Sequence, residues 1–178
     1  MKPDYIDPEI FGFMMTTELQ WLYTQAQRMG SIAEIGCWKG KSTHALLSGC
    51  SGPVFAVDHW KGSEAERTTG HAEALTQDIY AQFMANVGHF KNLVVRKMDS
   101  VEAARHFAPH SIDMVWIDGG LRKQDVIDDL TAWVPVCRKL LCGHDLNQGG
   151  VAIALLEMGI NYTTGAGSIW SYDLERLA

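Results

Sequence analysis

Short runs of apolar residues alternate along this chain with longer segments in which apolar residues recur every three or four positions. A short apolar run predicts a β-strand, and a recurrence of this period predicts an amphipathic helix. The predicted strands cover residues 32–35, 53–57, 93–95, 112–117 and 140–142. The predicted helices cover residues 13–29, 42–47, 72–87, 101–107, 126–138 and 151–158. Residues 161–172 are β-branched, aromatic and glycine-rich, which predicts a final hairpin.

This order of elements predicts an α/β fold. Strands that alternate with helices form a mostly parallel sheet with helices on both faces, so we expect a three-layer α/β/α sandwich. With the hairpin, the sheet has seven strands and ends in an antiparallel C-terminal edge. Residues 114–117 are apolar without alternation, which is typical of a strand buried on both faces. No linker divides the chain, so we expect residues 1–178 to form one domain, with a helical extension over 1–30 and the sandwich over 31–178.

Composition and charge narrow the class of protein. Of the 178 residues, 47% are hydrophobic and 20% are charged, as in an ordinary globular domain. The net charge of −6 disfavours a nucleic-acid binder, because such proteins carry a basic face. The sequence shows no signal-peptide core and no apolar stretch of membrane-spanning length. Its four cysteines form no Cys-x-x-Cys pair, so we expect a cytoplasmic protein with reduced thiols.

Polar residues gather where the predicted strands end. In a parallel sheet of this kind, ligands bind in a crevice at the carboxyl ends of the strands. Those ends carry Gly36, Asp58, Asp99, Asp118 and the pair His144-Asp145. The sequence therefore predicts one crevice that several acidic side chains line.

The loop after the first predicted strand combines glycines with the start of a helix. It reads Glu34-Ile-Gly36-Cys-Trp38-Lys-Gly40-Lys-Ser42. The dinucleotide pattern G-x-G-x-x-G does not match, because Trp38 stands where the second glycine is required. The phosphate-loop pattern needs four residues between its glycines, and only three separate Gly36 from Gly40. A phosphate-loop nucleotide hydrolase is therefore disfavoured, whereas the pattern E-x-G-x-x-x-G-x-S fits without adjustment.

This last pattern, with Asp58 placed 22 residues after Gly36, resembles motif I of class I S-adenosylmethionine-dependent methyltransferases. Residues 33–43 resemble the signature of a small stand-alone branch, related to macrolide-sugar O-methyltransferases and the cephalosporin hydroxylase-like group. Residues 57–63, 112–119 and 143–145 resemble its later blocks, in family order. The resemblance implies a Rossmann-like fold, S-adenosyl-L-methionine as cofactor and methylation of a small-molecule acceptor, at oxygen.

The resemblance also implies which residues bind the cofactor. Its methionine portion would be held by the glycine loop, through Glu34, Gly36, Trp38, Gly40 and Ser42. Asp58 would bind the ribose hydroxyls, and His59 or Trp60 would pack against the adenine. Asp99 and Ser100 would hold the adenine amino group, and Asp118 would lie close to the transferring methyl group.

Three residues are candidates for catalysis. His144 is the candidate general base, because an unperturbed histidine titrates near pH ~6.5. Asp118 and Asp145 would orient it, or would bind a divalent metal such as Mg or Mn through carboxylate oxygens. The usual Asp-His-x-Tyr continuation of the family is absent after Gly119, so a non-catalytic S-adenosylmethionine-binding protein is the alternative. The acceptor would be held by loops 62–70, 119–123 and 145–150, with help from the first helix, and a homodimer through the N-terminal helix is also expected.

Overall fold

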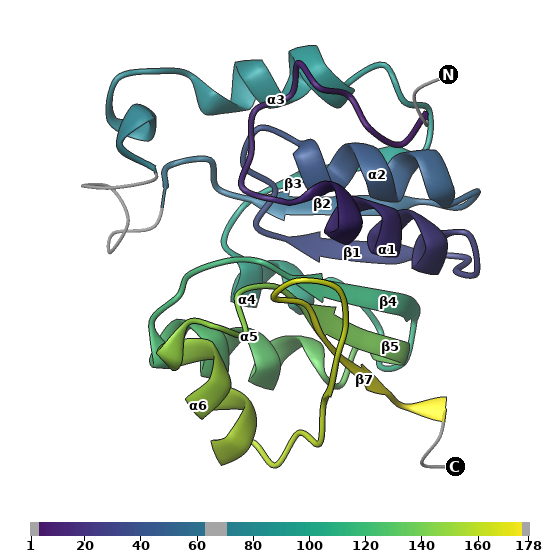
Figure 1. The fold of residues 1–178 in the computed structure, drawn as a ribbon, viewed down its shortest axis with the longest axis vertical. Coiled ribbons are helices and arrows are strands. Elements are labelled where there is room, and N and C mark those ends of the chain that lie inside the picture. Colours follow the sequence, from purple (N-terminus) through teal and green to yellow (C-terminus); the bar gives the residue numbers. More distant parts are fainter. Residues whose placement is uncertain (1–3, 63–70, 176–178) are drawn as a thin grey trace.

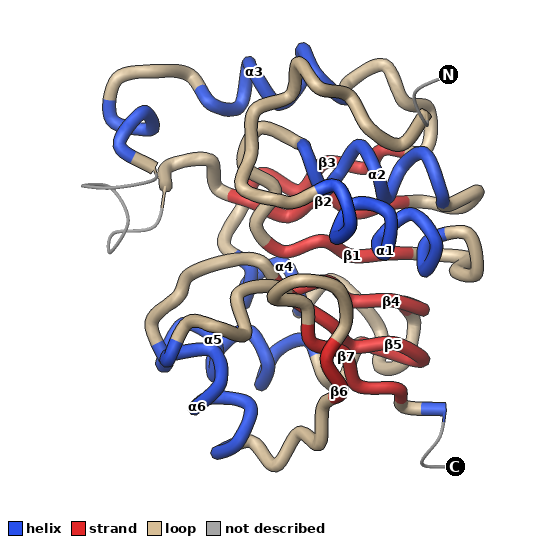
Figure 2. Tube along the Cα trace, viewed as in Figure 1, coloured by secondary structure: helices blue, strands red, loops and turns tan. Residues whose placement is uncertain are grey.

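A seven-stranded sheet forms the centre of the computed structural model, which describes residues 4–62 and 71–175. The strands follow the order β3-β2-β1-β4-β5-β7-β6. They are β1 (Ile32–Ile35), β2 (Val54–Asp58), β3 (Leu93–Lys97), β4 (Ile112–Ile117), β5 (Cys137–Gly143), β6 (Thr163–Thr164) and β7 (Trp170–Asp173). Strands β1 to β5 pair in parallel, and β7 runs antiparallel to β5 and β6. The predicted α/β sheet with an antiparallel C-terminal hairpin is confirmed (Figure 2).

Helices cover both faces of this sheet. They are α1 (Thr16–Ala26), α2 (Lys41–Gly49), the 3-10 turn η1 (Ala72–Leu75), α3 (Ile79–Val87), α4 (Ser100–Ala104), α5 (Lys123–Trp133) and α6 (Gly149–Glu157). Helices α1, α2 and α3 share one apolar core with the sheet, and α4, α5 and α6 share a second one. Figure 1 shows α1 and α2 in front of β1, and α5 and α6 together at the lower left.

The strands supply alternate residues to these two cores. In β4, Met114 and Trp116 belong to the core under α1 and α2, whereas Val115 and Ile117 belong to the core under α5 and α6. Successive side chains of a strand point to opposite faces, so the part of a strand that lies between two helical layers is apolar on both faces, as residues 114–117 are. All six residues of β4 are buried, which confirms the prediction from its unbroken apolar run.

Two predicted helices have different limits in the structure. The helix predicted over 72–87 is interrupted, because Asp78 caps a new helix by accepting a hydrogen bond from the Ala81 N–H at 2.9 Å. The helix predicted over 126–138 ends at Trp133, because the chain turns there and enters β5 at Cys137. The fifth strand is consequently longer than predicted and includes two charged residues, Arg138 and Lys139.

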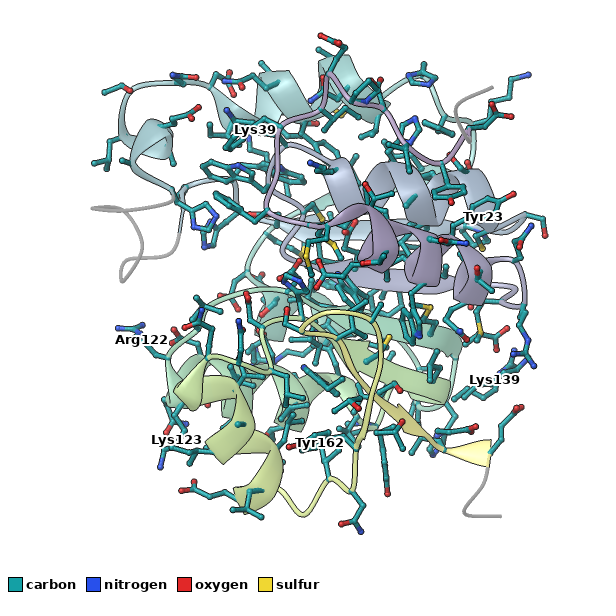
Figure 3. The ribbon with its side chains drawn as sticks, viewed as in Figure 1. Tyr23, Lys39, Arg122, Lys123, Lys139 and Tyr162 are labelled. Carbon is teal, nitrogen blue, oxygen red and sulfur yellow. The ribbon has the colours of Figure 1, made fainter. Side chains whose placement is uncertain are left out.

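The charges at the amino ends of the strands stabilise the fold and lie apart from the crevice. Asp113 of β4 is buried, accepts a hydrogen bond from the Gly30 N–H at 2.8 Å, and pairs with Arg138 and Lys139 of β5. In Figure 3, Lys139 and Arg122 lie on opposite sides of the molecule. Arg122 belongs to the side where the parallel strands end, and this side carries the site described next.

None of the helices within residues 4–62 and 71–175 has the length and apolar character that crossing a bilayer requires.

Candidate active site

The crevice opens between β1 and β4, where the order of the sheet reverses. After β1 the chain passes to α2 on one face, and after β4 it passes to α5 on the other face. Loops that leave a sheet in opposite directions leave a crevice between them, where ligands of such folds bind. A cavity of about 430 Å³ lies there, and Gly36, Asp58, Asp99 and Asp118 line it. Four of the predicted strand ends therefore meet in one cavity.

Gly36 allows the two loops to approach each other closely. Its φ is +84°, and a Cβ added at this position would lie 2.2 Å from the carbonyl oxygen of Asp118. Any other residue would be both strained and too close to the backbone of the neighbouring loop. Gly40 also has a left-handed conformation, with φ +92°, and directly precedes α2. The two glycines thus shape a tight turn between β1 and α2, as the sequence predicted.

Asp58 binds the backbone of this turn and also faces the cavity. Its Oδ2 accepts hydrogen bonds from the Cys37 N–H at 2.9 Å and the Trp38 N–H at 3.0 Å. Its Oδ1 accepts a hydrogen bond from the Trp60 N–H at 2.6 Å. The carboxylate remains 13% exposed and lines the cavity. Asp58 therefore has a structural role in addition to its predicted contact with the ribose.

Glu34 lies inside the protein and lines neither of the two cavities described here. Ser42 Oγ donates a hydrogen bond to its Oε1 at 2.5 Å. Its Oε2 is buried and has no hydrogen-bond partner among the described residues. Burial raises the pKa of this carboxyl to about 7, because the charged form is poorly solvated there.

The structure separates His59 from Trp60, which the sequence left as alternatives for packing against the adenine. His59 lines the cavity, whereas Trp60 is 5% exposed and packs against Tyr80 and Phe83. The Trp60 indole N–H donates to the carbonyl oxygen of Trp38 at 2.9 Å. The suggestion that Trp60 packs against adenine is therefore corrected, since its ring belongs to the core beside α3.

Asp99 and Ser100 line the same end of the cavity, as predicted. Asp99 Oδ1 accepts hydrogen bonds from the Val101 and Glu102 N–H groups and so caps α4. Ser100 Oγ donates a hydrogen bond to Asp129, a buried residue of α5 that the sequence suggested to be part of a solvated helix edge. Burial raises the pKa of Asp129 to about 6. Its position on a helix, next to the exposed Asp128, gave no signal that it faces the site.

His144 stands at the centre of a cluster of acids. Its Nδ1 lies 3.6 Å from Asp118 Oδ1 and 3.5 Å from Asp145 Oδ1, and its Nε2 lies 3.0 Å from Glu18 Oε1. The last strand residue before His144 is Gly143, and Asp145 takes a left-handed conformation with φ +58°, which turns it toward the other two residues. Asp118, His144 and Asp145 each offer one metal-ligand atom, and these atoms lie within 4.8 Å of one another.

The cluster changes the pKa of His144, on which its predicted role depends. Burial lowers the pKa of this imidazole, but the nearby carboxylates of Asp118 and Asp145 outweigh it and raise the pKa to about 11. An imidazole with this pKa carries both protons at neutral pH and cannot accept another. The general-base role of His144 stays a prediction, and the raised pKa opposes it. Burial also raises the pKa of Asp118, although His144 partly opposes this shift.

A second cavity of about 270 Å³ adjoins the first. The two cavities share Gly36, Trp38, His71, Asp118 and Gly119. The second is also lined by Phe11, Phe13, Lys41, His144 and Asp145. The segment before α1 thus forms one wall, which the hydrophobic pattern of the sequence did not reveal.

Two of the predicted acceptor loops, 119–123 and 145–150, contribute Leu121 and Gln148 to this cavity. Of loop 62–70, residues 63–70 lie outside the part of the chain that the structure describes, and Gly62 lines the larger cavity.

A family model described as a methyltransferase domain matches residues 33–145, which is more than half of the chain. The chain belongs to this methyltransferase family. The matched region begins in β1 and ends at Asp145, so it includes both the glycine loop and the acidic cluster. The predicted family and the predicted methyltransferase class are confirmed, and a phosphate-loop hydrolase is not favoured.

Among curated proteins, the chain resembles the uncharacterized protein y4gI of Sinorhizobium fredii. The two are 28% identical over 152 residues, which is 81% of this chain and 16% of that protein. The chain thus spans a small part of the length of this relative.

Solved structures with the same fold include several methyltransferases. An O-methyltransferase from Bacillus cereus in complex with SAH is 19% identical, with a TM-score of 0.62 over 93% of this chain and 84% of that one. The cofactor-bound protein Rv0187 from MTB is 16% identical, with a TM-score of 0.64 over 93% and 82%. CalS11, a TDP-rhamnose 3'-O-methyltransferase of calicheamicin biosynthesis, is 14% identical, with a TM-score of 0.56 over 88% and 77%. These likenesses confirm the Rossmann-like methyltransferase fold.

Proposed function

We propose that this methyltransferase transfers the methyl group of S-adenosylmethionine to a hydroxyl oxygen of a small-molecule acceptor, with a divalent cation bound at Asp118, His144 and Asp145. One observation carries the proposal: the larger and the smaller cavity meet at Asp118 and Gly119, beside the cluster of acids and imidazole. A donor in one cavity and an acceptor in the other would place their reacting atoms at this junction.

The larger cavity suits S-adenosylmethionine, which carries a sulfonium, an ammonium group and no phosphate. Its walls include Asp58, Asp99, Asp118 and further acids of α5, and these favour a cationic ligand. The cofactor found in the Bacillus cereus relative, SAH, is the product form of this donor.

The cluster of acids and imidazole suits a divalent cation. Ligand atoms about 2.1 Å from one ion lie about 3.0 Å apart in octahedral and about 3.4 Å apart in tetrahedral geometry. The distances of 3.5 and 3.6 Å from His144 Nδ1 to the two carboxylates are close to these values and longer than an ordinary hydrogen bond. When bound, such a cation would lower the pKa of a hydroxyl that contacts it.

The side chains and backbone of the site would then orient the two reactants. Methyl transfer is an in-line displacement in which an O–CH₃ bond forms and the S–CH₃ bond breaks, so alignment supplies most of the acceleration. The glycine loop would hold the sulfonium next to Asp118, and Phe11, Phe13 and Trp38 would hold the acceptor in the smaller cavity. Asp118 lines both cavities, and its carboxylate would take the proton of the hydroxyl.

Two finer features are proposals as well. A homodimer would use the N-terminal segment, where Phe11, Phe13 and Met15 are each more than half exposed. A cytoplasmic location is supported by the free thiols of Cys37, Cys50, Cys137 and Cys142, all of them buried.

The test uses the protein with labelled S-adenosylmethionine and a panel of small hydroxyl, amine and thiol acceptors. We expect label to appear on a hydroxyl acceptor, and Asp145→Asn to lose this turnover while S-adenosylhomocysteine still binds by calorimetry. Asp58→Ala should weaken that binding severely, and Glu157→Gln, on an exposed helix face, should change neither property. Label on amines alone, or full turnover in Asp145→Asn, would contradict the proposal.

A further inference from the structure

Glu18 of the N-terminal helix α1 is a buried carboxylate that reaches the site from outside the family match. It is 1% exposed, and its Oε1 lies 3.0 Å from Nε2 of His144. The same residue binds two backbone groups. Its Oε2 accepts a hydrogen bond from the Met15 N–H at 2.8 Å, and its Oε1 accepts one from the Ser168 N–H at 2.9 Å. One side chain therefore joins α1, the turn before β7 and the histidine of the cluster.

The turn before β7 is built to approach this carboxylate closely. Gly167 has φ +58°, and a Cβ added there would lie 2.2 Å from Oε1 of Glu18. A larger residue would push the turn away from the carboxylate. The position of Glu18 is thus fixed from both sides, by Met15 at the start of its own helix and by residues 167–168 of the turn.

This arrangement decides which nitrogen of His144 is free to bind a ligand. When a cation displaces the proton on Nδ1, the imidazole keeps one proton, and the carboxylate at Nε2 holds that proton there. Nδ1 is then left with its lone pair, and Nδ1 is the nitrogen that faces Asp118 and Asp145. In metal centres, a carboxylate on the far nitrogen of a ligating histidine fixes the ring and increases its basicity. Glu18 is in the position of that carboxylate.

We propose that Glu18 is a positioning residue which presents His144 Nδ1 as a metal ligand, and that the site of one imidazole and two carboxylates therefore prefers Mn²⁺, Co²⁺ or Zn²⁺ to Mg²⁺. Magnesium favours oxygen ligands alone, whereas imidazole suits transition metals. The inference rests on the proposed function, in which Asp118, His144 and Asp145 bind a cation. It adds Glu18 to that site and names the class of ion that the site prefers.

The experiment measures metal binding without any acceptor. Metal-free protein is titrated with Mn²⁺, Co²⁺ and Mg²⁺ by calorimetry, and Mn²⁺ binding is followed in parallel by electron paramagnetic resonance. We expect Mn²⁺ and Co²⁺ to bind the wild-type protein about tenfold or more tightly than Mg²⁺. Glu18→Gln should weaken Mn²⁺ binding about tenfold or more, because an amide cannot replace the carboxylate at Nε2. Glu157→Gln is the matched control and should bind Mn²⁺ as the wild type does.

A second variant tests the preference for one ion over another, and its readout is a ratio of two affinities that a general loss of stability would not change. His144→Asp creates a site of three carboxylates and should bind Mg²⁺ about as well as Mn²⁺. Imidazole ¹⁵N resonances of the Zn²⁺-loaded wild type provide a further measure that needs no substitution, and we expect Nδ1 metallated and Nε2 protonated. Equal affinity of the wild type for Mg²⁺ and Mn²⁺, wild-type Mn²⁺ affinity in Glu18→Gln, or metallation at Nε2 would each overturn the inference.

Binding of S-adenosylhomocysteine is measured on the same samples. If that ligand fails to bind while the metal results hold, the proposed methyl transfer fails and the metal assignment stands. If the ligand binds and the metal results fail, only the present inference is lost.

Discussion

Glu34 shows how burial changes the pKa of a residue whose type and place in a motif are already known from the sequence. The motif places this acid at the end of the first strand, and the structure buries it completely. Its pKa is raised to about 7 by burial, although Ser42 donates a hydrogen bond to it. Glu34 therefore lowers the stability of the protein at alkaline pH, where its charged form is poorly solvated.

A pH dependence of stability follows for this residue. The folded pKa of about 7 lies above the ordinary value of 4.5, so the folded state keeps a proton that the unfolded chain loses between these two pH values. Stability should fall as the pH rises through this window, by an amount on the order of 3 kcal/mol at pH ~8. Glu34→Gln should remove this loss, so that the variant without ligand melts higher than the wild type at pH ~8 and equally at pH ~4.5. Calorimetric melts over this range check it, with Glu157→Gln as the control that shows no such pH-dependent difference.

At the scale of elements, the amino ends of the strands are joined by Asp113. Its carboxylate connects β4 with Gly30 before β1 and with Arg138 and Lys139 of β5. Burial alone would raise the pKa of this acid, but the Gly30 N–H and the two cations outweigh it and hold the pKa below 3.8. The hydrogen bond and the ion pairs of Asp113 thus fix the amino ends of β1, β4 and β5. The carboxyl ends of these strands lead into the loops that line the two cavities.

Removing this carboxylate should destabilise the fold. Asp113→Ala should lower the free energy of unfolding by about 2 kcal/mol, because the Gly30 N–H loses its acceptor and Arg138 loses its partner. Since the folded pKa is depressed, this contribution is present above pH ~3.8 and is lost as the pH falls through the folded pKa. Urea unfolding at two pH values measures it. Glu157→Ala removes an exposed ion pair with Lys123 and should cost far less, so an equal loss in both variants would contradict the role of Asp113.

At the scale of the whole molecule, the site joins parts of the chain that lie far apart in the sequence. Asp58, Asp118 and His144 follow different strands, yet they line one pair of adjoining cavities, and Glu18 of α1 contacts His144. A ligand that fills these cavities contacts both halves of the sheet. Such a ligand stabilises the folded state as a whole, because it binds only when all these elements are in place.

Ligand-dependent melting should therefore identify the cofactor. S-adenosylhomocysteine at about 100 times its dissociation constant should stabilise the protein by about 2.7 kcal/mol. For a domain of this size, that corresponds to a rise in Tm of about 5 to 10 °C. ATP with magnesium, tested at the same concentration, should leave the Tm unchanged, because the glycine loop lacks the spacing of a phosphate loop and contains Glu34. A rise in Tm with ATP alone would refute the assignment of the cofactor.

The sequence by itself determined the order of the elements, the two-sided burial of β4 and the place of the site at the strand ends. These features follow from short-range patterns: the period of apolar residues fixes the type of element, and the parallel topology brings the strand ends to one edge. The glycine loop and Asp58 were equally readable, because their role depends on spacing within one β-α-β unit.

Only the tertiary structure decided the finer chemistry of the site. It placed Trp60 in the core, brought Glu18 to His144 across 126 positions of sequence, and made the imidazole a member of an acidic cluster. It also showed that Asp129 and the segment before α1 reach the cavities. No local pattern encodes such contacts, because a pKa and a ligand set depend on burial and on neighbours that folding brings together from distant parts of the chain.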